Sequence, residues 1–437
     1  MIAIDTLISA RWIIPIQPRE LVLESHSLAI QQGRIVAVLP QALALREYAA
    51  QEHVQLDHHA IIPGLVNLHT HAAMSLLRGL ADDLALMTWL KDYIWPAEAR
   101  YVAPDFVKDG SLLACAEMLR GGITCFSDMY FYPEATAAAV DQAGMRAMLG
   151  MIALEFPTAY AADADDYLRK GLETRDVYRS HERLRFCMAP HAPYTVSDKT
   201  LGQVLTLAEQ LDIPIHIHIH ETQDEIAESL KQCQQRPLAR LEALGVLGPQ
   251  VIAAHMVHLS AAEIALCAER GVHIAHCPIS NLKLASGIAP ISALLSAGVN
   301  VGLGTDGAAS NNRLDLLSDM RLAALLAKGA SGDATALPAH QALAMATLHG
   351  ARALGLEQEI GSLEAGKAAD LVAFDFSSLE MSPCFDLASH LVYVAGREHI
   401  SDVWVAGKRL LSQGRLTTLD TQDIAARTAR WQTQLSA

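Results

Sequence analysis

The stretch Ile61–His71, with the sequence IIPGLVNLHTH, decides the interpretation of this chain. An apolar run leads into two histidines spaced i, i+2. On a β-strand, alternate side chains point to the same face, so the imidazoles of His69 and His71 can reach one ion. Histidine is a common ligand of zinc and related divalent metals. The stretch therefore predicts a buried strand that ends in a candidate metal site, although a chance pair of histidines is an equally good explanation of this stretch alone.

The sequence around this stretch alternates between strand-like and helix-like segments. The strand-like segments after it are 123–127, 185–189, 213–219, 251–254, 272–275 and 299–303, and helical segments between and after them are 111–120, 199–210, 261–270 and 314–328. Such alternation predicts a parallel sheet, and its length favours a (β/α)₈ barrel. A doubly wound open sheet is the alternative, which the absence of G-x-G-x-x-G after a strand disfavours.

The two ends of the chain have a different sequence pattern, which is typical of β-strands joined by turns. Segments 28–30 and 35–39 flank a turn and predict a hairpin. Segments 371–375 and 402–410 are also β-rich and are punctuated by glycine, and 423–435 has the pattern of a closing amphipathic helix. We therefore expect strands from both ends to lie outside the alternating region.

One strand-like segment has a histidine at every second position near its carboxyl end. The sequence IPIHIHIHE (213–221) places His216, His218 and His220 on one face and the isoleucines on the other. In a barrel, the isoleucines would pack against the helices while the histidines face inward. A polar-faced edge strand is the less favoured alternative, because three buried histidines need polar partners.

Polar residues also end three later strand-like segments. His255 follows 251–254, His276 follows 272–275, and Asp306 comes shortly after 299–303. Each of these residues alone is more often structural than catalytic. Catalytic groups of (β/α)₈ barrels lie at the carboxyl ends of the strands, so their joint placement predicts one shared site.

Composition excludes several classes of protein. The chain has 437 residues, of which 51% are hydrophobic and 19% are charged, as expected of a globular protein with a large core. A net charge of −15 argues against a nucleic-acid-binding surface. The sequence has no stretch of about 18 apolar residues, so we expect no membrane span. The seven cysteines are scattered, and the start of the chain lacks a basic leader, so we expect reduced thiols and a cytoplasmic location.

Four motifs resemble those of the amidohydrolase superfamily, and two more resemble its 5-methylthioadenosine/S-adenosylhomocysteine deaminases. The four are PGLVNLHTH (63–71), His218-x-x-Glu221, AHCPISN (275–281) and GTDG (304–307), and the two are WPAE (95–98) and APHAPY (189–194). The resemblance covers nearly the whole chain. It implies an α/β fold, with a TIM-type barrel over residues 61–365 and a small β-sandwich composed of residues 1–60 and 366–437. The sequence GSLEAGKAADLV (361–372) would begin the return to the sandwich.

The resemblance also implies the metal ligands, which are His69, His71, His218 and Asp306. Three imidazoles and one carboxylate suit Zn²⁺ and leave a position for water. Spacing does not separate Zn²⁺ from Fe²⁺. Binuclear relatives carry a bridging modified lysine at an intermediate strand end, and the segments that end near 127 and 189 have none. We therefore expect one divalent metal per subunit.

By the same resemblance, the expected reaction is attack of a metal-activated hydroxide on C6 of an adenine ring. Asp306 would take up the water proton, His255 would orient the nucleophile, and Glu221 would pass a proton to the ring nitrogen and to departing ammonia. Substrate contacts would come from Glu98 (on the ribose hydroxyls), His191, Glu221 and Asp306. Taken without the resemblance, Glu98 is more simply a solvated helix residue.

The substrate expected from this resemblance is 5′-methylthioadenosine, deaminated to its inosine analogue, with adenosine and S-adenosylhomocysteine as further candidates. Segment 149–154 lacks an arginine for the homocysteine carboxylate, which favours the first two unless Arg169, Arg175 or a neighbouring subunit supplies one. A homo-oligomer is compatible with this class of enzyme.

The alternatives are a deaminase or dechlorinase of guanine, an oxidised purine, a pterin or an s-triazine, and a non-catalytic barrel scaffold. The scaffold is disfavoured because every expected ligand is present. The zinc deaminase fold that uses P-C-x-x-C is excluded, because the chain lacks that motif.

Overall fold

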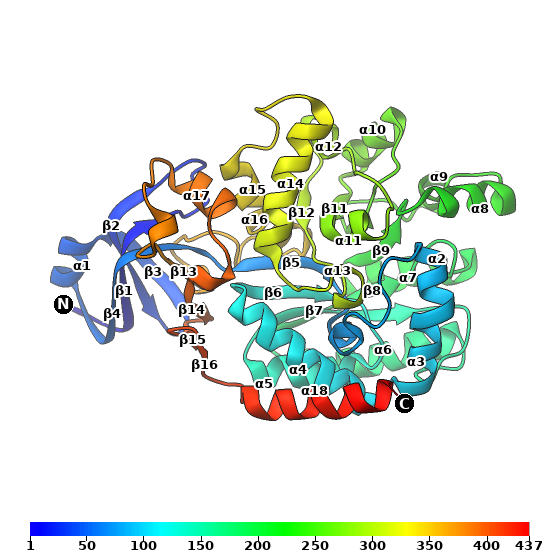
Figure 1. The fold of residues 1–437 in the computed structure, drawn as a ribbon, viewed down its shortest axis with the longest axis horizontal. Coiled ribbons are helices and arrows are strands. Elements are labelled where there is room, and N and C mark those ends of the chain that lie inside the picture. Colours follow the sequence, from blue (N-terminus) through cyan, green and yellow to red (C-terminus); the bar gives the residue numbers. More distant parts are fainter. Residues whose placement is uncertain (437) are drawn as a thin grey trace.

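The computed structural model describes residues 1–436, and within them a parallel sheet of eight strands forms a barrel (Figure 1). Each strand pairs with the next along the chain. The strands are β5 (Leu65–Thr70), β6 (Ile123–Asp128), β7 (Arg146–Ala153), β8 (Leu184–Pro190), β9 (Ile215–Ile219), β10 (Val251–His255), β11 (His273–His276) and β12 (Val301–Leu303). The first and last strands meet, because the amide of Asp306 donates to the carbonyl of His69 at 2.9 Å. The predicted barrel is thus confirmed.

Helices surround this barrel and bury the outer face of its strands. The isoleucines of β9, Ile215, Ile217 and Ile219, are fully buried in this layer, as their alternation predicts. The helices between and after the strands are α4 (Pro104–Arg120), α5 (Pro133–Ala143), α6 (Ala164–Tyr178), α7 (Asp198–Leu211), α8 (Gln223–Cys233), α9 (Pro237–Ala243), α10 (Ala261–Arg270), α12 (Ile291–Ser296), α14 (Leu316–Ser331), α15 (Ala339–Met345) and α16 (Leu348–Ala353).

Short helices follow the carboxyl ends of three strands and cover the mouth of the barrel. After β5 come η1 (Ala72–Leu77), α2 (Leu86–Trp89), the π-helical η2 (Leu90–Ile94) and α3 (Trp95–Tyr101). After β11 comes α11 (Pro278–Lys283), and after β12 comes α13 (Ala308–Asn311). Single turns of π-helix are frequent at functional sites.

A second sheet combines strands from both ends of the chain. Its order is β16-β15-β14-β13-β4-β1-β2-β3. The strands are β1 (Ile2–Ile13), β2 (Leu23–Gln31), β3 (Arg34–Pro40), β4 (Tyr48–Pro63), β13 (Leu371–Asp375), β14 (Ile400–Val405), β15 (Lys408–Ser412) and β16 (Arg415–Leu416), with α1 (Gln41–Glu47) after β3. The sheet folds back on itself, because a Cβ on Gly33 would lie 2.5 Å from the carbonyl oxygen of Ala406. Only glycine fits this close approach.

The segment after residue 366 also supplies helices that pack on the barrel. These are η3 (Leu379–Met381), α17 (Leu387–Tyr393), η4 (Arg397–His399) and α18 (Thr421–Leu435). In Figure 1, α18 (red) runs beside α4, where Arg427 forms an ion pair with Asp109 at 3.0 Å and Trp431 stacks edge-on against Phe106. The closing helix predicted from the sequence therefore covers the barrel and not the small sheet, because its apolar side meets Phe106 there.

The small sheet and the barrel share one buried ion pair. Arg146, at the start of β7, contacts Asp370 at 3.1 Å, and both side chains are almost fully buried. Within residues 1–436, none of the helices combines the length and the apolar character that crossing a bilayer requires.

Candidate active site

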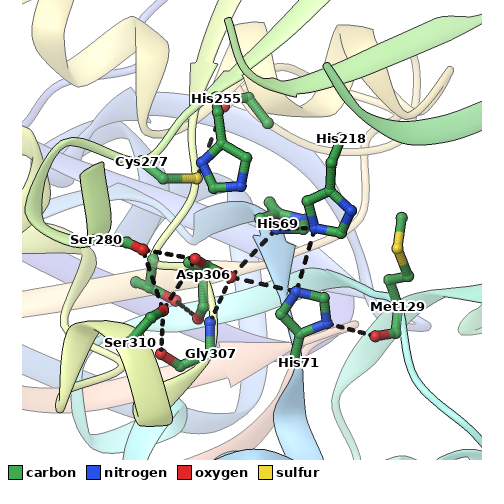
Figure 2. Close-up of polar contacts among 12 residues, drawn as sticks. His69, His71, Met129, His218, His255, Cys277, Ser280, Asp306, Gly307 and Ser310 are labelled. Atoms are coloured by element: carbon green, nitrogen blue, oxygen red, sulfur yellow. Dashed lines mark hydrogen bonds and ion pairs between the residues drawn. The ribbon is translucent and has the colours of Figure 1, made fainter. Parts of the chain in front are cut away.

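Four side chains that the sequence predicts as metal ligands converge at the carboxyl ends of the strands (Figure 2). His69 and His71 come from β5 and the residue after it, His218 from β9, and Asp306 from the loop after β12. The Oδ1 atom of Asp306 lies 3.3 Å from Nε2 of His69 and 3.2 Å from Nε2 of His71. The Nε2 atom of His218 lies 3.2 Å from that of His69 and 3.3 Å from that of His71.

Hydrogen bonds on the far side of the rings orient these Nε2 atoms. The Nδ1 atom of His71 donates to the carbonyl of Met129 at 2.6 Å, and that of His218 donates to the carbonyl of His191 at 2.7 Å. A carbonyl can only accept, so each Nδ1 carries a proton, and Nε2 is the atom of each imidazole that can bind a metal when the ring is neutral. Nδ1 of His69 is hydrogen-bonded to Nε2 of His216 at 3.0 Å.

The four donor–donor distances given above fit Zn²⁺. With Zn–N distances of about 2.0–2.1 Å, a tetrahedral site places its ligand atoms about 3.3–3.4 Å apart, close to the distances observed here. Lone pairs this close to one another and to a carboxylate are stable only around a cation or a proton. The residues present therefore fit a divalent metal of the zinc type.

Asp306 is held as a carboxylate by its surroundings. Its Oδ2 accepts hydrogen bonds from Ser280 at 2.6 Å and Ser310 at 2.9 Å, and its Oδ1 accepts one from the amide of Gly307 at 2.8 Å. Burial alone would raise its pKa, but His69 and His71 hold the pKa well below the usual range of an aspartate. Asp306 is thus charged at neutral pH.

His255 and Glu221 lie beside the donor cluster, and a ring nitrogen of His255 lies within 4.8 Å of those of His69 and His218. The ring of His255 lies 5.4 Å from that of His69, and its Nε2 lies 3.8 Å from a carboxylate oxygen of Glu221. Nδ1 of His255 is hydrogen-bonded to Oδ1 of Asn281 at 2.8 Å, which leaves Nε2 facing the site. Burial raises the pKa of Glu221, and the amide of this residue is fixed by the carboxylate of Glu225 at 2.8 Å.

Two of these residues adopt left-handed backbone conformations at strand ends. The φ angle is +72° at His255 and +62° at Asp306. Non-glycine residues tolerate this region at a cost, and such strain clusters at functional sites.

His220 also has a positive φ, of +55°, with a different consequence. Strand β9 ends at Ile219, so the alternation stops there. Nε2 of His220 instead accepts from the amide of Leu238 at 3.2 Å and lies 3.8 Å from Glu263. The expectation that His220 shares the face of His216 and His218 is therefore wrong.

The donor cluster opens into a cavity of about 590 Å³, within the usual range of small-molecule sites. Glu98 of α3 and His191, which follows β8, both line it. Burial raises the pKa of Glu98 to about 7. The remaining wall is largely apolar and includes Trp89 and Trp95. Among the described residues that line the cavity, none is lysine or arginine.

Comparison with known proteins identifies the family. Residues 60–410 match the family described as "Amidohydrolase family". The chain belongs to the amidohydrolase family. It is 49% identical over 434 residues to a protein of Teredinibacter turnerae named "5-methylthioadenosine/S-adenosylhomocysteine deaminase", with 99% of this chain and 98% of the relative covered.

Solved structures of two other proteins are similar to this chain over nearly its whole length. A crystal structure of an adenosine deaminase from Xanthomonas campestris with bound zinc is 50% identical, with a TM-score of 0.98 over 100% of this chain and 99% of the other. One of atrazine chlorohydrolase from Arthrobacter aurescens, complexed with zinc, is 26% identical, with a TM-score of 0.91 over 98% of this chain and 99% of the other. These comparisons confirm the predicted family, the barrel and the hydrolytic class of enzyme.

Several site contacts of this amidohydrolase were not expected from its sequence. His216 links His69 to the hydroxyl of Ser127, which lies 3.2 Å from Nδ1 of His216. Tyr130 donates a hydrogen bond to Glu98. The position of Tyr130 shortly after a predicted strand could have indicated that it lies near the site. The sequence does not indicate which side chain its hydroxyl contacts.

Proposed function

We propose that this amidohydrolase removes the amino group of an adenine nucleoside by hydrolysis, releasing ammonia and the inosine analogue, with 5′-methylthioadenosine as its preferred substrate. One Zn²⁺ would be held by His69, His71, His218 and Asp306. The observation that carries the proposal is the carboxylate of Glu98, which lines the same cavity as the four converging donors. The names of the relatives from Teredinibacter turnerae and Xanthomonas campestris support it.

Each polar group around the donor cluster has a role in this reaction. When bound, Zn²⁺ lowers the pKa of a coordinated water to about 7 and so supplies a nucleophile at neutral pH. The charged carboxylate of Asp306 would accept a proton from the attacking water. The Nε2 atom of His255, on the ring that Asn281 orients, would hold this water for attack.

Glu221 acts as the general acid of the proposed reaction. Its raised pKa favours the protonated form, which would donate its proton to a ring nitrogen as water adds to C6. Glu221 would then regain a proton from the new C6 hydroxyl and pass it to the amino group, whose C–N bond breaks to release ammonia. The proton held by Asp306 would restore the acid form of Glu221. Attack at the amino-bearing carbon is thus matched by protonation of the ring. His191 lies against His218, with ring centroids 4.9 Å apart, and contributes to the wall that contacts the nucleoside.

The cavity wall favours uncharged 5′ substituents. A carboxylate such as Glu98 can accept from two adjacent hydroxyls of a ribose. Arg169 is paired with Asp166 and Glu173 on α6, and neither it nor Arg175 lines the cavity, so neither supplies a partner for a homocysteine carboxylate. We therefore place 5′-methylthioadenosine and adenosine ahead of S-adenosylhomocysteine.

The test is ammonia release by the zinc-loaded protein from 5′-methylthioadenosine, adenosine, S-adenosylhomocysteine, guanine and an aminotriazine. We expect fast release from the first two, with the adenine ultraviolet spectrum changing to that of hypoxanthine. Metal analysis should give one zinc per chain. Release from guanine or the triazine alone, with E98Q as active as the wild type, would overturn the nucleoside assignment.

A further inference from the structure

The turn after β6 contains a contact that the proposed reaction does not use. The hydroxyl of Tyr130 donates a hydrogen bond to Oε1 of Glu98 at 2.7 Å. Only 4% of the Tyr130 surface is exposed, and burial together with Glu98 raises the pKa of its hydroxyl. Tyr130 therefore stays protonated and can act as a fixed donor to the carboxylate.

This contact joins two parts of the cavity that are distant in the sequence. Glu98 lies on α3, in the segment that covers the mouth of the barrel, whereas Tyr130 is the second residue after β6. The preceding residue, Met129, provides the carbonyl that accepts from Nδ1 of the predicted metal ligand His71 at 2.6 Å. Two consecutive residues thus hold His71 and Glu98 in place, which fixes the distance between the reacting centre and the carboxylate.

We propose that Tyr130 is a positioning residue that fixes Glu98 for recognition of the vicinal 2′- and 3′-hydroxyls of a ribonucleoside. This inference rests on the proposed function. Tyr130 occupies one lone pair of Oε1, so the second lone pair of Oε1 and those of Oε2 remain to accept from the two sugar hydroxyls, and the side chain is held in one rotamer. Within residues 1–436, no other side chain forms a hydrogen bond with Glu98. Tyr130 therefore determines specificity for the sugar and leaves chemistry at the base unaffected.

The experiment compares adenosine with 2′,3′-dideoxyadenosine in the zinc-loaded Y130F variant. A hydrogen bond to a charged group typically contributes about 10- to 100-fold. We expect kcat/KM for adenosine to fall by about that factor, mainly through KM, while kcat/KM for the dideoxy analogue changes less than about 3-fold. In an E98Q background, Y130F should cause no further loss.

A matched control is Y167F, which removes a hydroxyl from another buried tyrosine of the same apolar cluster. Tyr167 contacts Thr158 at 2.6 Å and does not line the cavity. We expect Y167F to affect both substrates equally. If Y130F does not fold, E98D tests the same contact, because removing one methylene withdraws the carboxylate from Tyr130 and keeps its charge.

The outcomes separate the two proposals. Three results would overturn the role of Tyr130. They are an equal loss of kcat/KM in Y130F for adenosine and for the dideoxy analogue, additive effects of Y130F and E98Q, and wild-type kinetics of E98D on adenosine. A wild-type enzyme that deaminates only free bases would overturn the proposed function, whatever the effect of Y130F.

Discussion

His216 offers a test of how the barrel prepares its metal site. It is fully buried and connects Nδ1 of His69, at 3.0 Å, to the hydroxyl of Ser127, at 3.2 Å. Replacing it with phenylalanine keeps a ring in the core but removes both hydrogen bonds. Nδ1 of His69 would then be a buried polar atom without a partner, which costs about 1–3 kcal/mol. Since 1.4 kcal/mol corresponds to a factor of ten, zinc affinity should fall about 5- to 140-fold.

The assay is competition for Zn²⁺ between the metal-free protein and a chromogenic chelator, which requires no turnover. His273 of β11 provides the control, because it hydrogen-bonds Asn300 at 3.0 Å and contacts none of the predicted metal ligands within residues 1–436. The zinc affinity of H273F should therefore be within about 2-fold of the wild-type value. S127A should lose less zinc affinity than H216F, because it removes only the hydrogen bond between Ser127 and His216. Wild-type affinity in H216F, or an equal loss in H273F, would refute the reasoning.

Three further predictions concern pH, catalysis and stability. Because burial raises the pKa of Glu98 to about 7, its carboxyl gains a proton at lower pH and loses an acceptor site, so kcat/KM for adenosine should fall as pH drops below about 7. Ionisation of a zinc-bound water would affect every substrate alike, so the test is the difference between the acid limbs of adenosine and 2′,3′-dideoxyadenosine. E98Q should abolish this difference, and a difference that persists would contradict the assignment. N281L removes the acceptor that orients His255, so kcat should fall about 10-fold or more with zinc content unchanged; wild-type kcat would exclude this role. R146M leaves Asp370 charged and buried, so urea denaturation should show a loss of about 3–5 kcal/mol with zinc affinity retained. Wild-type stability would show that this ion pair does not join the two sheets.

Much of the barrel could be predicted because buried parallel strands have short apolar runs with polar ends. The exception is β7 (Arg146–Ala153), which was not expected as a strand. Its sequence RAMLGMIA has one β-branched residue and begins with an arginine that is buried only because Asp370 pairs with it. Propensity and periodicity cannot anticipate a partner more than 200 positions away.

The same limit applies inside the site. Alternation places His216 and His218 on one face correctly, because both lie within a regular strand, and fails at His220, where the strand has ended. Periodicity states which face a side chain occupies, but not which distant side chain it contacts. The hydrogen bonds of His216 with His69 and of Tyr130 with Glu98 therefore became visible only in three dimensions.

The backbone at the strand ends explains why these positions carry functional residues at all. At His255 and Asp306, a left-handed φ would favour glycine, and each non-glycine residue there costs about 1–3 kcal/mol. Glycine would relieve that strain but would remove the side chain that faces the donor cluster. Around Asp306 the strain is offset by its own hydrogen bonds, since its amide donates to His69 and its carboxylate accepts from Ser280 and Ser310. The same contacts that hold the carboxylate toward the metal position thus stabilise the strained turn, so that the geometry of the site and the closure of the barrel depend on one another.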